Sequence, residues 1–269
     1  MLHLIKSYLN FLWQSKNQHG VHSPFVFHLV TKCFYDTTIY SEYKTLKEYR
    51  KRLLRNKQFI EVTDFGAGSR VFKSNNRQIS KIAQTAGISV KKAELLFRIV
   101  RYFQPEHILE IGTSLGLATS ALSLGLESET NRAKLNQKSK ITTLEGCPKT
   151  SGQAQEQFKE FHLDNIQSVV TEFNEYLKKN SFATTHYQLI YFDGNHSKEA
   201  TLHYFESLLP TITNETVWIF DDIHWSKEME QAWEEIKNHP KVTVTIDTFQ
   251  WGLVFFRKEQ EKEHFTIRT

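Results

Sequence analysis

Hydrophobic and polar positions follow two different periods along the chain. In the first hundred residues the period is helical. Ser89 precedes apolar residues at positions 93, 96, 97, 100 and 103, which lie on one face of a helix that Pro105 stops. The stretch SPFVFHLV at 23–30 begins with Ser and Pro, the residues that open a helix. Residues 1–104 are therefore predicted to be mostly helical.

From residue 107 onward the pattern changes to short apolar runs that end in Gly or an acid. They are HILEIG (107–112), ITTLEG (141–146), YQLIYFDG (187–194) and TVWIFDD (216–222), and helical stretches separate the later ones. This alternation predicts an α/β fold, doubly wound, with a mostly parallel, seven-stranded sheet. VTVTIDT and WGLVFFR near the end predict an antiparallel hairpin at the sheet edge.

The same pattern divides the chain into two regions. Residues 1–88 are predicted to be a helical N-terminal extension that serves as a substrate lid or in dimerisation, and residues 89–269 to be the catalytic domain. The polar segment 127–140 is interpreted as a surface loop.

Composition narrows the function classes. The net charge of +4 is mild, and the basic run at 43–57 is interpreted as a solvated helix face, so no nucleic-acid partner is expected. No apolar run is long enough to span a membrane. Cys33 and Cys147 match no metal or disulfide pattern, which predicts reduced, structural cysteines and a cytoplasmic protein.

Two glycine-rich stretches compete for the role of ligand loop: DFGAGS at 64–69 and LEIGTSLG at 109–116. In an α/β sheet the ligand loop joins the end of a buried strand to a helix. DFGAGS is followed by the irregular, polar RVFKSNNRQ, whereas LEIGTSLG ends an apolar strand and leads into the small-residue helix LATSALSLGL. The second stretch is therefore predicted to hold the ligand. DFGAGS is interpreted as a loop over the active site, with Ser69 and Arg70 near the substrate, or as a plain interdomain turn.

The spacing of the predicted loop indicates the kind of ligand. Gly112 and Gly116 are four residues apart, and Thr113 and Ser114 fill the place where dinucleotide enzymes have the middle glycine that admits a pyrophosphate. This favours an adenosyl ligand without phosphates over NAD. Glu145 ends the next strand, where a carboxylate can accept both ribose hydroxyls.

These motifs resemble those of a known family. LEIGTSLGLATSALS resembles the first motif of class I S-adenosylmethionine-dependent methyltransferases and TLEG their acidic second motif, and the resemblance spans about residues 90–257. YFDGNHSKEATLHYFESLLP and VWIFDDIHWS are similar to the metal-dependent O-methyltransferase branch, which includes catechol-type and macrocin-type sugar O-methyltransferases. The resemblance implies that S-adenosylmethionine is bound by Glu110, Gly112, Thr113, Ser114, Gly116, Glu145, Gly146 and Asp193. It implies that Asp193, Asp221 and Asp222 ligate a divalent cation.

The acids can also be interpreted from their positions alone. If the strands that end at Asp193 and at Asp221 and Asp222 are neighbours, their carboxylates converge, and oxygen ligands suit a hard cation such as Mg²⁺. The alternative is that Asp222 or Ser226 caps the following helix and that Asp193 belongs to a turn.

Two histidines follow the acids at the same spacing. His196 lies three residues after Asp193 and His224 three after Asp221, and each is a candidate general base for a substrate hydroxyl or a locally bonded loop residue. Asn195 is a candidate for orienting the substrate or ligating the cation, and Trp225 for lining the acceptor pocket.

Together these features predict an S-adenosylmethionine-dependent, cation-assisted O-methyltransferase that acts on a small hydroxylated molecule, with a homodimer as a possible assembly. An NAD-type oxidoreductase and a non-catalytic ligand-binding protein of the same fold are the alternatives. The identity of the acceptor does not follow from the sequence.

Overall fold

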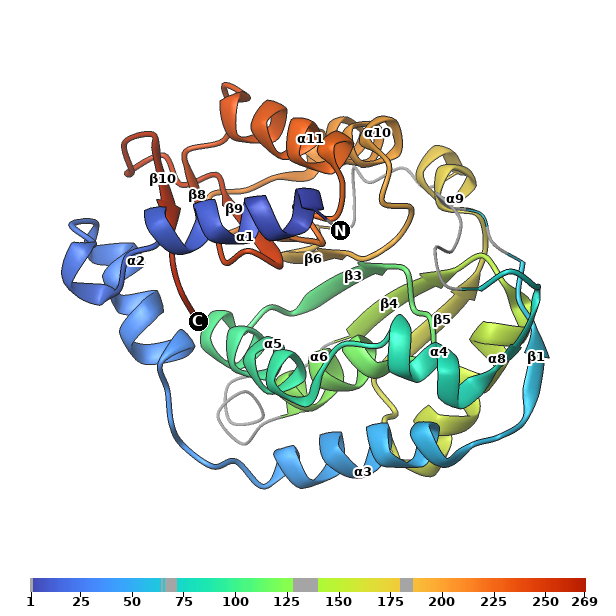
Figure 1. Cartoon of the computed structure of the whole chain (residues 1–269). Coiled ribbons are helices and arrows are strands. Elements are labelled where there is room, and N and C mark those ends of the chain that lie inside the picture. The colour runs from blue at the N-terminus through green and yellow to red at the C-terminus, as the bar shows by residue number, and fades with distance from the viewer. Residues whose placement is uncertain (1, 64, 66–71, 128–139, 180–185) are drawn as a thin grey trace. The chain divides into compact units, whose positions relative to one another are not determined.

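The computed structural model describes residues 2–63, 65, 72–127, 140–179 and 186–269 (Figure 1). The chain forms two compact units, one of residues 1–35 with 177–269 and one of residues 36–176. This division does not coincide with the predicted boundary at residue 88, and the roles predicted for residues 1–88 stay predictions. Most of DFGAGS, with Ser69 and Arg70, and most of the predicted loop at 127–140 lie outside the described residues.

The unit of residues 36–176 is built on parallel strands joined by helices. Three strands lie side by side and run parallel, in the order β3 (His107–Ile111), β4 (Lys140–Glu145) and β5 (Ile166–Val170). The helix α6 (Leu117–Glu127) follows β3, and α8 (Pro148–Glu160) connects β4 to β5. From its second to its last residue β3 is buried, which is the expected state of an apolar run in a parallel sheet.

The helix that follows the ligand loop packs closely against a second helix of this unit. The helix α5 (Val90–Phe103) begins at the predicted cap, where the Ser89 side chain accepts a hydrogen bond from the amide of Lys92. α6 approaches it closely, because a Cβ atom on Gly125 would lie 2.7 Å from the Cβ atom of Val100. Small residues in α6 therefore allow the two helices to pack closely.

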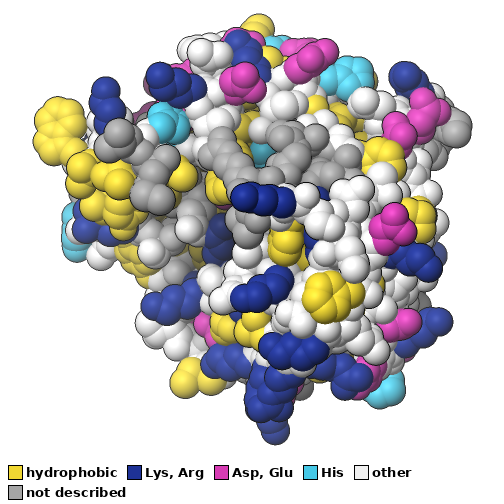
Figure 2. All heavy atoms as spheres, turned by 45° about the vertical axis from the view of Figure 1, so that its right-hand side comes forward, with side chains coloured by type: hydrophobic (Ala, Val, Ile, Leu, Met, Phe, Trp, Pro, Cys, Tyr) yellow, Lys and Arg dark blue, Asp and Glu magenta, His cyan; other side chains and the backbone are white. Residues whose placement is uncertain are grey.

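The first part of this unit is less helical than predicted. Between α3 (Glu42–Arg55) and α4 (Ile79–Thr85) the chain forms a two-stranded antiparallel sheet of β1 (Phe59–Glu61) and β2 (Asn76–Gln78). Strands of three residues with mixed polarity carry no readable period, so the pattern could not predict them. α3 buries Tyr43, Leu46, Tyr49 and Leu53 and exposes most of its basic residues, as expected for a solvated helix face. On the face seen in Figure 2, Lys and Arg side chains are most frequent in the lower part, with acidic side chains among them.

The unit of residues 1–35 and 177–269 contains the remaining strands. Their order is β10 (Glu263–Thr266), β8 (Val244–Asp247), β9 (Trp251–Phe255), β7 (Val217–Asp221) and β6 (Leu189–Phe192). Only β9 runs against its neighbours among these described strands. The predicted antiparallel hairpin is therefore confirmed, but β10 pairs with β8 and takes the edge position. Among the described residues, the two units contribute five and three strands to the α/β fold, one more than the predicted seven.

The helices of this unit begin largely where serine caps predict. Ser23 and Ser226 accept hydrogen bonds from the amides three residues further on. The helices are α1 (Leu2–Gln14), α2 (Pro24–Leu29) with a π-helical continuation (Val30–Phe34), α10 (Lys198–Leu208) and α11 (Lys227–Asn238), and α9 (Phe173–Lys179) spans the boundary between the units. Within the described residues, every helix is too short or too polar to cross a lipid bilayer.

Candidate active site

The predicted ligand loop is a tight turn between β3 and α6. Gly112 and Gly116 have φ values of 107° and 77°, and Ser114 has a φ of 49°. All three therefore adopt a conformation that glycine accepts freely and other residues rarely do. The amides of Gly112 and Thr113 both donate hydrogen bonds to the carbonyl oxygen of Leu144, at 3.0 Å each. This pairing fixes the turn against the end of the neighbouring strand β4.

The side chain of Glu145, the last residue of β4, connects the loop after β3 to the chain after β4. One of its carboxylate oxygens, Oε2, accepts a hydrogen bond from the amide of Ser114 at 2.8 Å, and the other, Oε1, accepts one from the amide of Cys147 at 2.9 Å. A carboxylate has about four lone-pair directions and can accept more than two hydrogen bonds. The predicted loop and the predicted acid are thus brought together in one hydrogen-bonded arrangement.

Glu110 lies beneath the loop. Its side chain is fully buried, and Oε2 accepts hydrogen bonds from the hydroxyls of Thr119 at 2.6 Å and Thr143 at 2.5 Å. The hydroxyl of Thr143 also lies 2.5 Å from that of Thr113. This position favours a supporting role for Glu110, and its predicted contact with the cofactor stays a prediction.

A side chain from the N-terminal region supports the loop from another side. Tyr49 of α3 is fully buried, and its hydroxyl donates a hydrogen bond to the carbonyl oxygen of Leu115 at 2.9 Å. A Cβ atom on Gly116 would lie 2.6 Å from that hydroxyl and 2.4 Å from Cε1 of Phe158. The space beside Gly116 is therefore filled by protein atoms, and a ligand can approach the loop only elsewhere.

The predicted acids meet at the ends of two neighbouring strands of the other unit. β6 and β7 are parallel, with Phe192 opposite Phe220, so that Asp193 and Asp221 occupy corresponding positions one residue further on. Asp221 is buried, and one of its carboxylate oxygens accepts a hydrogen bond from the amide of Asp222 at 2.9 Å. The expectation that these strands are neighbours is confirmed.

His196 lies within this acid cluster. Its Nε2 atom is 3.5 Å from Oδ1 of Asp193, and both side chains are largely buried. Burial alone would lower the pKa of His196, but its hydrogen bond to Asp193 and the surrounding carboxylates raise the pKa to about 9. Burial, and next the negative charge of Asp221, raise the pKa of Asp193 to about 7. The pair therefore places an imidazolium beside carboxylates that repel one another.

Two residues at these strand ends have unusual backbone conformations. Asn195 and Asp222 have φ values of 50° and 53°. Asn and Asp tolerate this left-handed region better than other non-glycine residues, but it remains sparsely populated, and such residues are common at functional sites. Together with Ser114 they place a left-handed residue in three of the four loops where site residues are predicted.

His224 is held differently from His196. Its Nδ1 atom is 2.8 Å from Oε1 of Glu230, its Nε2 atom is 2.9 Å from Oδ2 of Asp247, and its ring stacks on Phe249. Burial would lower the pKa of His224, but the two carboxylates raise it. Both ring nitrogens of His224 are thus engaged by protein carboxylates, and its role as a general base stays a prediction. This geometry favours His196 as the general base.

Asp193, Asp221 and Asp222 are chemically suitable ligands for the predicted cation, but their side chains are not arranged around one metal position. Three carboxylates at adjoining strand ends are the ligands that Mg²⁺ prefers. Within the described residues, however, no group of three or more His, Cys, Asp or Glu side chains is arranged so that it could hold a metal ion. Ser226 caps α11, as the alternative interpretation of this stretch expected. The cation therefore stays a proposal.

The structure thus places the glycine turn after β3 and the acid at the end of β4, the two features on which the sequence resemblance to methyltransferases was based. Residues 109–223 match the profile of a family described as a methyltransferase domain. No curated protein is significantly similar in sequence. The predicted resemblance to methyltransferases is thus confirmed over residues 109–223.

Solved structures share the fold at low sequence identity. The S-adenosylhomocysteine-bound methyltransferase PaMTH1 of Podospora anserina is 14% identical, with a TM-score of 0.59, over 88% of this chain and 97% of that one. The O-methyltransferase of Bacillus cereus in complex with S-adenosylhomocysteine is 17% identical, with a TM-score of 0.55, over 85% and 96%. The O-methyltransferase TomG of Streptomyces achromogenes in complex with S-adenosylmethionine is 13% identical, with a TM-score of 0.55, over 82% and 91%.

Several residues that hold the site together escaped the sequence analysis. Thr143 and Cys147 bond to Glu110 and Glu145, and Tyr49 bonds to the glycine loop from a helix more than sixty residues earlier. Glu230 and Asp247 bind His224. Tyr49, Thr143 and Asp247 act through contacts between distant parts of the chain, whereas Cys147 and Glu230 act over a few residues but belong to no motif that the sequence analysis used.

Proposed function

We propose that this protein is an S-adenosylmethionine-dependent O-methyltransferase that acts on a hydroxyl group of a small molecule. The observation that carries the proposal is the bonding of Glu145 to the loop amide of Ser114, which unites the glycine turn with the acid expected to bind ribose. The methyltransferase-domain match over residues 109–223 and the O-methyltransferases of the same fold support it.

The cofactor chemistry explains why the site needs few reactive groups. The sulfonium of S-adenosylmethionine supplies an activated methyl group, so the protein has to bind, orient and deprotonate its substrates. In the proposal, Gly112, Thr113, Ser114 and Gly146 approach the cofactor with backbone atoms, and Glu145 accepts hydrogen bonds from the ribose hydroxyls. The turn lacks the middle glycine that a pyrophosphate would require, which supports an adenosyl ligand over NAD.

The acid cluster is proposed to handle the acceptor. In its neutral form His196 takes the proton of the acceptor hydroxyl, and Asp193 orients its imidazole through the contact at 3.5 Å. A cation held by the neighbouring carboxylates would offset the negative charge that favours the imidazolium form of His196. Asp193, Asp221 and Asp222 would hold a divalent cation, most naturally Mg²⁺, which when bound lowers the pKa of a coordinated hydroxyl. The convergence of Asp193 and Asp221 on neighbouring strands supports this part of the proposal.

The enzymatic test measures formation of S-adenosylhomocysteine from S-adenosylmethionine with a panel of phenols and sugars, in Mg²⁺ or in EDTA. With an accepted substrate, Asp221→Asn is expected to lower turnover at least about 100-fold and to leave S-adenosylhomocysteine binding within about twofold. Asp164→Asn, which changes an exposed acid of the same type, is the matched control. Calorimetric titration with Mg²⁺ gives a second readout, in which wild type binds and Asp221→Asn does not.

The outcomes separate the parts of the proposal. Full turnover in EDTA would remove the cation, and full turnover of Asp221→Asn would remove the role of the acid cluster. Binding of NAD without binding of S-adenosylhomocysteine would favour an oxidoreductase. Binding of S-adenosylhomocysteine without turnover on any compound of the panel would favour a non-catalytic ligand-binding protein.

The N-terminal region and the cell compartment complete the proposal. We propose that residues 1–88 contribute to the acceptor pocket or to a homodimer interface. Cys33 and Cys147 are both buried and are not joined in a disulfide, which supports a reducing compartment such as the cytoplasm.

A further inference from the structure

The second glycine-rich stretch, DFGAGS, contains one residue that the structure describes, Phe65. Its ring lies directly against Gly146, the residue after the ribose-binding acid of the proposed function. A Cβ atom on Gly146 would lie 2.7 Å from Cδ2 and 3.1 Å from Cε2 of Phe65. These atoms belong to one edge of the ring. The residue as a whole is 48% exposed, so a large part of the aromatic surface is open to solvent.

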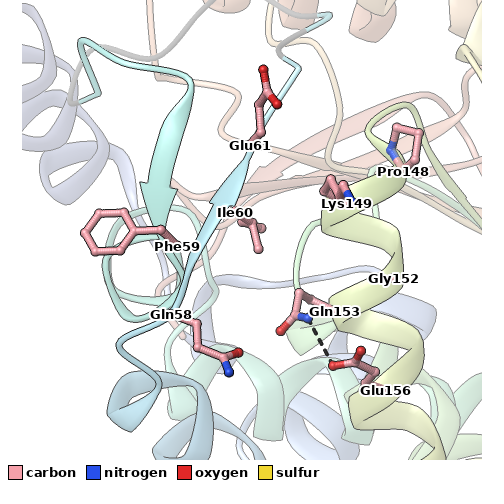
Figure 3. A pocket seen from close by; sticks show the side chains of 9 residues that line it. All are labelled: Gln58, Phe59, Ile60, Glu61, Pro148, Lys149, Gly152, Gln153 and Glu156. Atoms are coloured by element: carbon pink, nitrogen blue, oxygen red, sulfur yellow. Dashed lines mark hydrogen bonds between the residues drawn. The ribbon is translucent and has the colours of Figure 1, made fainter.

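The chain just before Phe65 is tied to the same end of β4 by contacts of its own. The thiol of Cys147 donates to the carbonyl oxygen of Glu61 at 3.6 Å, and the amide of Thr63 donates to Cys147 Sγ at 3.4 Å. β1 therefore runs alongside the beginning of α8. The cavity between β1 and α8, of about 690 Å³, is lined by residues of both elements (Figure 3). The strand that precedes Phe65 is therefore anchored next to Gly146.

We infer that the ring of Phe65 forms one wall of the subsite for the adenine base of S-adenosylmethionine. The inference rests on the proposed function, because Glu145 then fixes the ribose. The base is attached to the ribose carbon next to the one that bears the 2′-hydroxyl, so it must lie near the residues around Glu145. A half-exposed aromatic ring against the next residue offers the base a stacking surface.

Gly146 has a defined part in this arrangement. Any side chain at this position would collide with the Phe65 ring and push it away, because the Cβ distance of 2.7 Å is shorter than an ordinary contact. Glycine at 146 and phenylalanine at 65 are therefore coupled, although 81 residues separate them in the sequence. In this proposal Phe65 adds to the cofactor site an aromatic wall that the glycine loop does not supply.

The test is calorimetric titration of the full chain with S-adenosylhomocysteine and, separately, with adenosine. Stacking of a base on an aromatic side chain predicts that Phe65→Ala weakens binding of both ligands about 10-fold. Phe65→Trp keeps a stacking surface and is expected to bind within about threefold of wild type. Phe59→Ala is the matched control, because Phe59 is 61% exposed on β1 and its ring points away from α8 in Figure 3. It is expected to bind like wild type.

The results distinguish this inference from the proposed function. If wild type binds S-adenosylhomocysteine and Phe65→Ala binds it equally well, the inference is wrong and the proposed function stands. Weakened binding of S-adenosylhomocysteine with unchanged binding of adenosine would also overturn it, because the ring would then act away from the base. If wild type binds neither ligand, the proposed function fails first. Thermal melting of each variant checks that the substitutions leave the fold intact.

Discussion

Replacing Gly116 with alanine tests the shape of the glycine loop. Gly116 has a φ of 77°, and a Cβ atom there would lie 2.4 Å from Cε1 of Phe158 and 2.6 Å from the hydroxyl of Tyr49. The left-handed conformation costs an L-residue about 1–2 kcal/mol, and inserting a methyl group into a packed site costs about 1–3 kcal/mol more. We expect Gly116→Ala to lower the free energy of unfolding by about 2–5 kcal/mol.

A second glycine provides a control of opposite sign. Gly152 lies inside α8, and a Cβ atom there would meet no atom within 4 Å. Because alanine favours a helix over glycine by about 0.5–1 kcal/mol, Gly152→Ala is expected to stabilise the protein slightly. Thermal unfolding followed by circular dichroism should show Gly116→Ala melting roughly 5–15 °C below wild type and Gly152→Ala slightly above it. A Gly116→Ala variant that melts with wild type would refute the described loop packing.

Two further predictions concern Tyr49 and His224. Tyr49→Phe removes the hydroxyl that donates a hydrogen bond to the carbonyl oxygen of Leu115. Because this leaves a buried carbonyl unpaired, the variant should lose about 1–3 kcal/mol of stability and bind S-adenosylhomocysteine severalfold more weakly. Tyr8→Phe, at an exposed position, is the control and should change neither stability nor binding. The raised pKa of His224 means that its pairing with Glu230 and Asp247 stabilises the fold fully below its unfolded pKa of 6.5 and loses this contribution as pH rises through the folded pKa. The difference in melting temperature between wild type and His224→Gln should therefore shrink as the pH rises above 6.5, and a constant difference would show that the pairing does not titrate.

The sequence predicted those parts of the molecule that are local in the chain. The strand that leads into Gly112, the strand end at Glu145 and the caps at Ser23, Ser89 and Ser226 follow from short-range patterns, because each depends on residues within a few positions. The choice between the two glycine stretches also rested on local context, namely the strand before the loop and the helix after it.

The features that the sequence did not predict depend on contacts between distant segments. The edge strand β10 is a short, polar run whose pairing with β8 carries no signal of its own. The engagement of both nitrogens of His224 required Asp247 and Glu230, which stand 23 and 6 residues away. The contact of Phe65 with Gly146 is of the same kind. A motif identifies which residues have the right chemistry, whereas packing decides which of them are free to react.

Calorimetric titration of the full chain with S-adenosylhomocysteine, in wild type and in Glu145→Ala, tests the central claim most directly. The account predicts one ligand bound per wild-type chain, no binding of NAD, and affinity about 10- to 100-fold weaker in Glu145→Ala, because hydrogen bonds to a charged carboxylate are lost. Absence of S-adenosylhomocysteine binding to wild type, or equal binding by Glu145→Ala, would contradict it.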